Sequence, residues 1–231
     1  MKNSDAGLRR CGAIQGSSTG RSETSLSLVT MLRFLKCQLR SLQGPLMSRQ
    51  DDLRLLHQYT QSESLFRHML AVEAAVRAYA IKFGEDADKW ATVGLMHDFD
   101  YERWPDPPDH PLQGAEILKE HGYPNDVIYA IKSHADYLTD CPRVSRLDKT
   151  LYACDELCGF LVACALMRPG RLEGMEPRSV RKKMRQVSFA AAVNRDDIVR
   201  GAADLGVDLD EHIAFVIAAL QPIAAELGLT T

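Results

Sequence analysis

The apolar residues that follow Gln50 recur at intervals of three and four nearly to the end of the chain, and this periodicity restricts the fold more than any other feature. Residues at this spacing share one face of a helix, whereas a strand requires alternation with a period of two. No stretch alternates for long enough to predict a strand. The first stripe consists of Leu65, Met69, Val72, Val76, Tyr79 and Phe83. The sequence therefore predicts an all-α protein.

Capping residues predict where several of these helices begin and end. Thr60 with Glu63 has the pattern of a capping box, which predicts a helix that runs to Gly84. Ser145 with Asp148 has the same pattern, and it precedes the most uniformly apolar helix, which we expect to be central. Two further helices are predicted to start near residues 86 and 124. The remaining predicted helices cover 111–122, 146–167, 178–187, 195–204 and 209–227, and Asp208 caps the last of them.

Length and composition favour one globular domain. The chain has 231 residues, of which 45% are apolar, so it can bury a full core. No apolar run approaches the roughly 18 residues that a membrane span needs, and we expect no membrane association. The formal net charge of −3 argues against a stable nucleic-acid complex. Six cysteines do not make a disulfide framework in a chain of this length, so we expect reduced thiols and a cytoplasmic location.

The first fifty residues differ from the remainder in charge and pattern. They carry eight basic and two acidic residues, a formal charge of +6, which leaves −9 for residues 51–231. They are also rich in serine and glycine and lack sustained periodicity. We expect a domain at 48–231 after an extension at 1–47. Three interpretations of the extension stay open: a disordered or vector-derived segment, a true start at Met31 or Met47, or an organellar transit peptide.

Ionisable side chains interrupt the apolar faces of five consecutive helices. His68 lies three residues after Leu65 on its stripe, and His134 lies three residues after Ile131. Asp155 lies inside the most apolar helix. A buried ionisable group is costly unless it is paired or bound to a metal ion. The full set comprises His68, His97, Asp98, His110, His134 and Asp155.

The six side chains are imidazoles and carboxylates, which together suit divalent ions such as Fe, Mn, Zn and Co. They exceed the needs of one four-coordinate ion, but they are enough for two ions that share a bridging carboxylate. Two metal ions about 3.5–4 Å apart can clamp a phosphoryl group and generate a hydroxide nucleophile near neutral pH. The alternative interpretation is six polar residues that are each satisfied independently. We expect a metal centre in the core of a helical bundle.

The order and spacing of these residues resemble those of the HD superfamily of metal-dependent phosphohydrolases. His97 follows His68 by 29 residues, and His110 follows Asp98 by 12. The next two separations, to His134 and then to Asp155, are 24 and 21 residues. The likeness covers roughly residues 50–225 and is greatest to the small HDIG-type predicted hydrolases of bacteria. Most of it lies in Arg67-His68-Met69, Gly94-Leu95-Met96-His97-Asp98 and His110-Pro111-Leu112-Gln113-Gly114.

The resemblance implies a single HD-type helical bundle with the metal site in its core. It also implies divalent metal ions as cofactors (Mn, Fe, Co, Zn or Mg), two per chain, with Asp98 as the bridge and Asp98 and His97 as the catalytic residues. The remaining ligands would be His68, His97 and Asp155 for one ion and His110 and His134 for the other. The region after Asp98 lacks the Gly-Tyr-Pro signature of cyclic-di-GMP phosphodiesterases, and the chain lacks the synthetase portion of stringent-response enzymes. Neither of those substrates is supported.

A phosphohydrolase also needs cations beside the charged phosphate. Three candidate basic residues lie at or just before the start of the helix that bears Asp155, and three lie in the acid-free span from Pro177 to Arg195. These six are Arg143, Arg146, Lys149, Arg181, Lys182 and Lys183. For the second group a solvated helix face is the alternative. The general acid stays open among Asp100, Glu102 and Glu156.

These residues predict hydrolysis of a small phosphomonoester or a nucleotide-like phosphodiester. The same six ligands also serve the mixed-valence di-iron centre of the inositol-oxygenase-like branch of the superfamily. A non-catalytic module that senses a ligand is a third interpretation. We expect a small phosphorylated substrate as the partner, and a homo-oligomer stays open.

The remaining histidines and the cysteines of the central helix are expected to be structural. His57, His121 and His212 have no partner at a useful spacing, so surface or capping positions are expected for them. Small core residues are expected at Cys154, Cys158 and Cys164.

Overall fold

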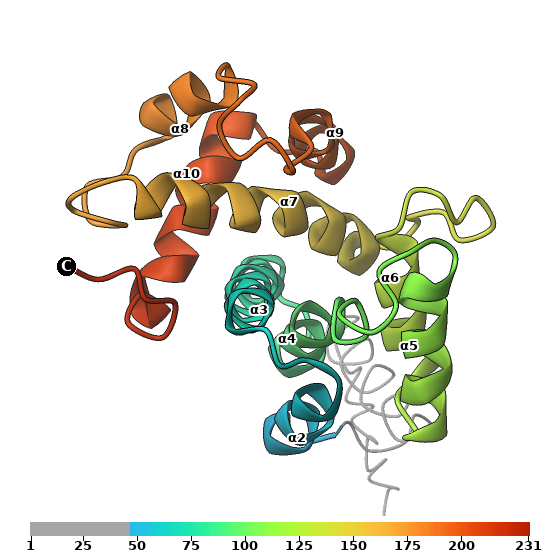
Figure 1. Cartoon of the computed structure of the whole chain (residues 1–231). Coiled ribbons are helices and arrows are strands. Elements are labelled where there is room, and N and C mark those ends of the chain that lie inside the picture. The colour runs from blue at the N-terminus through green and yellow to red at the C-terminus, as the bar shows by residue number, and fades with distance from the viewer. Residues whose placement is uncertain (1–46) are drawn as a thin grey trace, which may run out of the picture. The chain divides into compact units, whose positions relative to one another are not determined.

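The computed structural model describes residues 47–231, and every regular element in that part of the chain is a helix (Figure 1). The predicted all-α class is confirmed. The predicted extension at 1–47 lies outside the described residues except for Met47. The helices are α2 (Arg49–Tyr59), α3 (Glu63–Phe83), α4 (Ala87–Met96), α5 (Asp109–Glu120), α6 (Asn125–Ser133), α7 (Arg146–Leu166), α8 (Pro177–Met184), α9 (Arg195–Leu205), α10 (Leu209–Leu220) and the 3-10 turn η1 (Gln221–Ile223).

The predicted helix starts are confirmed at α7 and α10. Ser145 and Asp148 form a reciprocal capping box at the start of α7. The side chain of Asp208 accepts two backbone N–H groups from the first turn of α10. The last helix is shorter than predicted, because α10 ends at Leu220 and the following turn contains Pro222, which has no N–H to continue the helix.

The predicted capping box at Thr60 and Glu63 is wrong. Ser62 caps α3, and its hydroxyl accepts the N–H of Leu65. Thr60 is instead the C-cap of α2, and its hydroxyl donates to the carbonyl of Phe99 at 2.9 Å. Because that hydroxyl is buried and committed to Phe99, it cannot cap the next helix.

Two long helices, α3 and α7, cross at the centre of the domain (Figure 1). His68 near the start of α3 lies beside Asp155, and Phe83 at its end lies against the guanidinium of Arg146 at the start of α7. α4 packs against α3, and α9 packs across α7 (Figure 1). α6 contacts α4, α5 and α7, while α10 contacts α3, α7 and α8. Five consecutive helices, α3 to α7, therefore surround one part of the core.

At two of these contacts the helix backbones lie too close for a side chain between them. A Cβ atom on Gly94 of α4 would lie 2.9 Å from backbone atoms of Val72 and Glu73 in α3. A Cβ atom on Gly201 of α9 would lie 2.7 Å from the Cα of Ala153 in α7. Glycine at these positions allows the close approach and fixes how far the end of α4 lies from α3.

The apolar core runs along α3, α4 and α7, where side chains such as Met69, Val93 and Leu157 are fully buried. α7 buries residues on almost every side, as predicted. Cys154, Cys158 and Cys164 are buried within it, in agreement with their predicted core positions. Within residues 47–231, none of the helices combines the length and the apolar character needed to cross a bilayer.

His212 of α10 is fully buried, so its predicted surface or capping position is wrong. Its Nε2–H donates to the carbonyl of Ala153 at 2.9 Å, and its Nδ1 accepts from the Tyr79 hydroxyl at 2.6 Å. Burial lowers the pKa of His212, which keeps the ring neutral in this tautomer. His57 and His121 are exposed, as predicted.

The Tyr79→Phe variant should be less stable by about 1–3 kcal/mol, because it leaves the buried Nδ1 of His212 without a donor. Urea unfolding of the two proteins measures the difference. Tyr129→Phe is the control, since the Tyr129 hydroxyl donates to the carbonyl of Pro142 near solvent. An equal loss in both variants would contradict a special role for the buried pair.

Candidate metal centre

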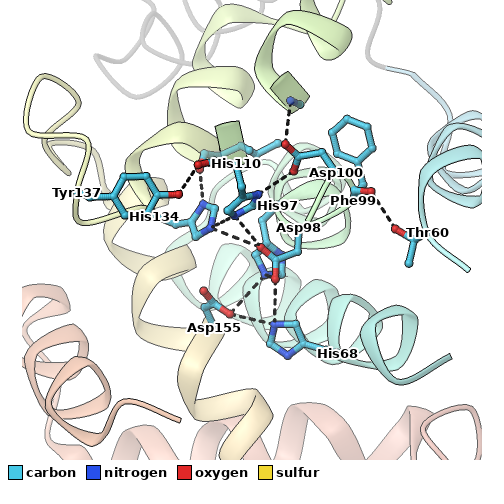
Figure 2. A network of polar contacts seen from close by, with 12 residues as sticks. Thr60, His68, His97, Asp98, Phe99, Asp100, His110, His134, Tyr137 and Asp155 are labelled. Carbon is cyan, nitrogen blue, oxygen red and sulfur yellow. Dashed lines mark hydrogen bonds and ion pairs between the residues drawn. The ribbon is translucent and has the colours of Figure 1, made fainter. Parts of the chain in front are cut away.

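Six polar side chains from five consecutive helices and their ends converge in the core (Figure 2). Two come from α3 and α7, and the others lie at the ends of α4 and α6, in the turn after α4, and in the first turn of α5. The set is the one that the sequence analysis singled out: His68, His97, Asp98, His110, His134 and Asp155. Each of the six lies within contact distance of at least one other member of the set.

One group of these side chains lies between α3, α7 and the end of α4. His68 Nε2 is 3.0 Å from Asp155 Oδ1 and 3.9 Å from Asp98 Oδ2. His97 Nε2 is 3.4 Å from both of these carboxylate oxygens. The four side chains therefore present two nitrogens and two oxygens toward one point.

A second group lies between α5 and α6, on the other oxygen of the same aspartate. Asp98 Oδ1 is 3.3 Å from His110 Nε2 and 3.5 Å from His134 Nε2. The two imidazole nitrogens are 3.2 Å apart. Three ligand atoms in each group all lie within 4.8 Å of one another, close enough to hold one metal ion: those of His68, His97 and Asp98 in the first, and those of Asp98, His110 and His134 in the second.

Two of the histidines are oriented by the carbonyl three residues earlier on their own helix. His97 Nδ1–H donates to Gly94 at 2.9 Å, and His134 Nδ1–H donates to Ile131. Carbonyls in the last turn of a helix lack intrahelical partners, so these bonds satisfy groups that would otherwise need water. Because Nδ1 is committed to the carbonyl, Nε2 is the atom left to offer a lone pair to a metal ion beside Asp98.

One buried nitrogen of the site has no hydrogen-bond partner among residues 47–231. His97 Nε2 is completely buried and, although two carboxylates are near, makes a hydrogen bond to neither. A buried polar atom without a partner is costly, and a metal ion would satisfy it. Ligand atoms on one ion with bonds of about 2.1 Å lie roughly 3.0–3.4 Å apart, close to most of the separations in both groups. The donor set therefore fits a divalent metal.

The two aspartates of the site are ionised. Burial opposes the charge on Asp98, but the imidazole of His97 and two further histidines outweigh it and hold the pKa of Asp98 well below its usual range. The pKa of Asp155 is also lowered, since His97 and His68 outweigh the effect of burial. Both side chains are thus anionic ligands at neutral pH.

Solvent reaches the site from one side. The side chains of His68 and Asp155 are each 20% exposed, whereas those of His97 and His110 are 0% and 7% exposed. The site is therefore open between α3 and α7 and closed toward α4 and α5.

The basic residues near the start of α7 make contacts of their own. Arg143 donates to Asp136 at 2.5 Å, and its guanidinium lies 3.6 Å from the ring centroid of Tyr152. The guanidinium of Arg146 lies over Phe83, at the opposite end of α3 from His68. Lys149 is half-buried in the second turn of α7. Arg143 is thus neutralised by an ion pair, and the structure does not bring Arg146 to the six side chains.

The basic residues of α8 also lie apart from the six side chains. Arg181 is 3.6 Å from Asp210, Lys183 lies over the ring of Phe189, and Lys182 is exposed. The segment after α8 reaches α7, where the ring of Phe189 contacts Phe160. No contact among residues 47–231 joins the three cations to the six side chains.

Two of the carboxylates left open as the general acid have defined partners. Glu102 accepts two backbone N–H groups just before α3 at 2.8 Å each. Glu156 accepts the N–H of Asn194 at 3.2 Å, and burial, with the neighbouring Asp155 charge, raises the pKa of Glu156 to about 7. Glu102 has a capping role at the start of α3, and Glu156 directly follows Asp155 in α7, with its carboxylate held by the backbone of Asn194.

Asp100 has a role that the sequence analysis did not define. It is buried, and its Oδ1 accepts Nδ1–H of His110 at 2.9 Å. Its Oδ2 accepts the N–H of Gly114 at 2.9 Å. In the sequence, Asp100 was notable only for its position two residues after Asp98. Its role depends on His110, which lies on another helix, α5.

Two exposed aromatic residues beside the site were not singled out from the sequence. Tyr101 is 43% exposed, and its ring meets the ring of His110 edge-on, with centroids 5.1 Å apart. Tyr137 is 44% exposed, and its hydroxyl donates to the carbonyl of His110 (Figure 2). Neither residue belongs to an apolar stripe, so periodicity could not reveal them.

Residues 65–159 match the family model described as HD domain. The matched segment contains all six side chains of the site. No solved structure matches the chain.

Several curated proteins named Ribonuclease Y are similar to part of the chain. The protein of Nitratidesulfovibrio vulgaris is 32% identical over 111 residues, which are 46% of this chain and 20% of that protein. The protein of Desulfotalea psychrophila is 29% identical over 110 residues, again 46% of this chain and 20% of that protein. That of Oleidesulfovibrio alaskensis is 27% identical over 164 residues, 64% of this chain and 28% of the relative. The chain spans 20–28% of the length of these relatives.

Replacing Asp98 by Ala should abolish metal binding by both groups, because Asp98 is the one side chain that they share. His68→Ala should weaken only the first group, and His134→Ala should weaken only the second. Elemental analysis of each purified protein after loading with manganese gives the ions per chain. Metal content equal to wild type in Asp98→Ala would contradict the assignment.

Proposed function

We propose that this chain, which carries an HD domain, is a metal-dependent phosphohydrolase that acts on a small phosphomonoester or a nucleotide-like phosphodiester. One observation carries the proposal. Asp98 divides its two carboxylate oxygens between two groups of histidines, with Oδ2 beside His97 and Oδ1 beside His110 and His134. A bridging carboxylate of this kind is what a pair of metal ions requires.

In this proposal Asp98 would hold both of two divalent ions. The other ligands would be His68, His97 and Asp155 for the first ion and His110 and His134 for the second. When bound, two such ions clamp a phosphoryl group and lower the pKa of a bound water to near neutral. Mn, Fe, Co, Zn and Mg are all compatible with the mixed nitrogen and oxygen donors.

The chain itself would position the substrate and limit the access of water. His97 and His110 close the inner side of the site, so a phosphate would enter between α3 and α7, beside His68 and Asp155. Glu156 directly follows Asp155 in α7, and burial with the neighbouring Asp155 charge raises the pKa of Glu156 to about 7. We propose that Glu156 is the strongest candidate for the general acid, because it neighbours a metal ligand in the chain and its pKa lies near the working pH.

Tyr101 and Tyr137 favour a nucleotide-like phosphodiester as the substrate. Both rings are more than two-fifths exposed, and both residues contact His110. Exposed aromatic rings bind nucleobases by stacking, which is favourable for any base. A substrate that carries a base beside its phosphate would therefore gain a contact that a sugar phosphate lacks.

The relatives named Ribonuclease Y support a ribonucleotide phosphodiester as one substrate class. The similarity covers about half of this chain, so it supports the chemistry of the HD segment rather than the whole activity of those proteins. The di-iron oxygenase alternative uses the same six ligands, and only the metal and the reaction distinguish it.

The manganese-loaded protein should release nitrophenol from nitrophenyl phosphate or from its bis-ester, and His68→Ala should reduce this rate to background. His57→Ala is the matched control, because His57 is an exposed histidine outside the site, and its activity should equal that of wild type. The assay is paired with metal analysis. Two ions per chain without hydrolysis of either ester would contradict the proposal, and two irons with a mixed-valence spectrum under oxygen would support the oxygenase.

Replacing Arg181, Lys182 and Lys183 together by Gln should raise KM for the phosphorylated substrate roughly tenfold if α8 binds the phosphate, which corresponds to about 1.4 kcal/mol. Steady-state kinetics on wild type and variant measure the change. The control replaces Arg54 and Lys119, which form exposed ion pairs on other helices. An unchanged KM would assign the α8 cations to a solvated helix face.

A further inference from the structure

Asp100 is one of the most deeply buried carboxylates in the described part of the chain, and both of its oxygens are in use. Its side chain is 1% exposed. Oδ1 accepts Nδ1–H of His110 at 2.9 Å, and Oδ2 accepts the backbone N–H of Gly114 at 2.9 Å. Figure 2 shows the carboxylate of Asp100 beside the ring of His110. The geometry fixes Asp100 at two points and leaves it little freedom to turn.

Gly114 makes room for this carboxylate. A Cβ atom at position 114 would lie 2.7 Å from the carboxyl carbon and from Oδ2 of Asp100. Real Cβ atoms do not approach so closely, so any other residue would push the carboxylate away. The first turns of α5 therefore provide both the histidine and the space for the group that holds it.

This support distinguishes His110 from the other two histidines of the six-residue site that have a defined Nδ1 partner. Those two, His97 and His134, donate to backbone carbonyls, whereas His110 donates to a carboxylate. A carboxylate behind a metal-binding imidazole fixes its tautomer and ring orientation and makes it a stronger ligand. The two halves of the proposed metal centre are thus supported differently.

We infer that Asp100 is a positioning residue for the ion held by Asp98, His110 and His134. It holds the proton on Nδ1 of His110, so that the lone pair of Nε2 faces Asp98 and His134. The inference rests on the proposed metal centre, and it adds that the second ion depends on a carboxylate that does not touch it.

The test is the variant Asp100→Asn, which keeps the size of the side chain. An amide cannot accept from both His110 and Gly114, because one of its two ends is a donor. The affinity for the second manganese ion should fall by about 10–100-fold, while the affinity for the first is unchanged. Competition with a coloured chelator measures both affinities and requires no turnover.

Asp52→Asn is the matched control. Asp52 is equally buried, at 1% exposed, and it also accepts two hydrogen bonds, from Tyr123 at 2.6 Å and Thr92 at 2.9 Å. Its loss should lower the thermal stability and leave both metal affinities as in wild type. Equal metal loss in the two variants would mean that Asp100 acts only through the stability of the fold, and the inference would be overturned.

A double-mutant cycle tests whether Asp100 acts through His110. In a His110→Ala background, Asp100→Asn should cause no further loss of affinity, because the imidazole that it positions is absent. Additive losses would overturn the inference. If Asp100→Asn does not fold, Gly114→Ala is the second variant, which keeps the carboxylate but displaces it, and the same selective loss of the second ion is expected.

The outcomes separate the inference from the proposed function. A wild-type protein that binds no metal ion overturns the proposed function itself. A wild-type protein that binds metal, with Asp100→Asn identical to it at every ion, overturns the inference alone.

Discussion

The structure depends on how ionised side chains are stabilised inside a helical core. An isolated buried carboxylate would cost several kcal/mol. This domain places Asp155 within its central helix α7 and Asp98 in the turn after α4, and both side chains are no more than one-fifth exposed. Imidazoles from four different helices or helix ends surround these two carboxylates. Since each helix from α3 to α7 supplies part of the set, the packing of the helices and the pairing of the charges stabilise each other. Loss of any one of the five helices would therefore leave ionised side chains in the core without their partners.

Much of the fold could be predicted because the signals for it are local. Apolar spacing identifies the helices, and the pairs at Ser145 and Asp148 or at Asp208 identify helix starts, since a capping side chain and its backbone partners lie within one turn. The six site residues could also be found in this way. An ionisable residue such as His68 or Asp155 on an apolar stripe is unusual by itself, and the unusual positions turn out to be neighbours in space.

The predictions that failed, and the roles that were missed, depend on partners far along the chain. Thr60 looked like a cap, but its hydroxyl is taken by Phe99, 39 residues later. His212 looked like a surface residue, but it pairs with a tyrosine 133 residues away. Arg143 stands close to the site in sequence, yet a flexible guanidinium can turn to any acid within reach, and it binds Asp136. Local sequence patterns do not predict these hydrogen-bond and ion-pair partners, because tertiary packing determines them.

Two of the site histidines stand at the point where a helix stops: His97 ends α4, and His134 ends α6. An additional residue within either helix would rotate the following imidazole by about 100° and advance it by about 1.5 Å, which would remove it from Asp98. The lengths of these two helices are therefore as strictly limited as the identities of the histidines. Insertions and deletions in related chains should be confined to the connections, such as the proline-rich segment between Arg103 and Pro108, where an added residue changes no ring orientation.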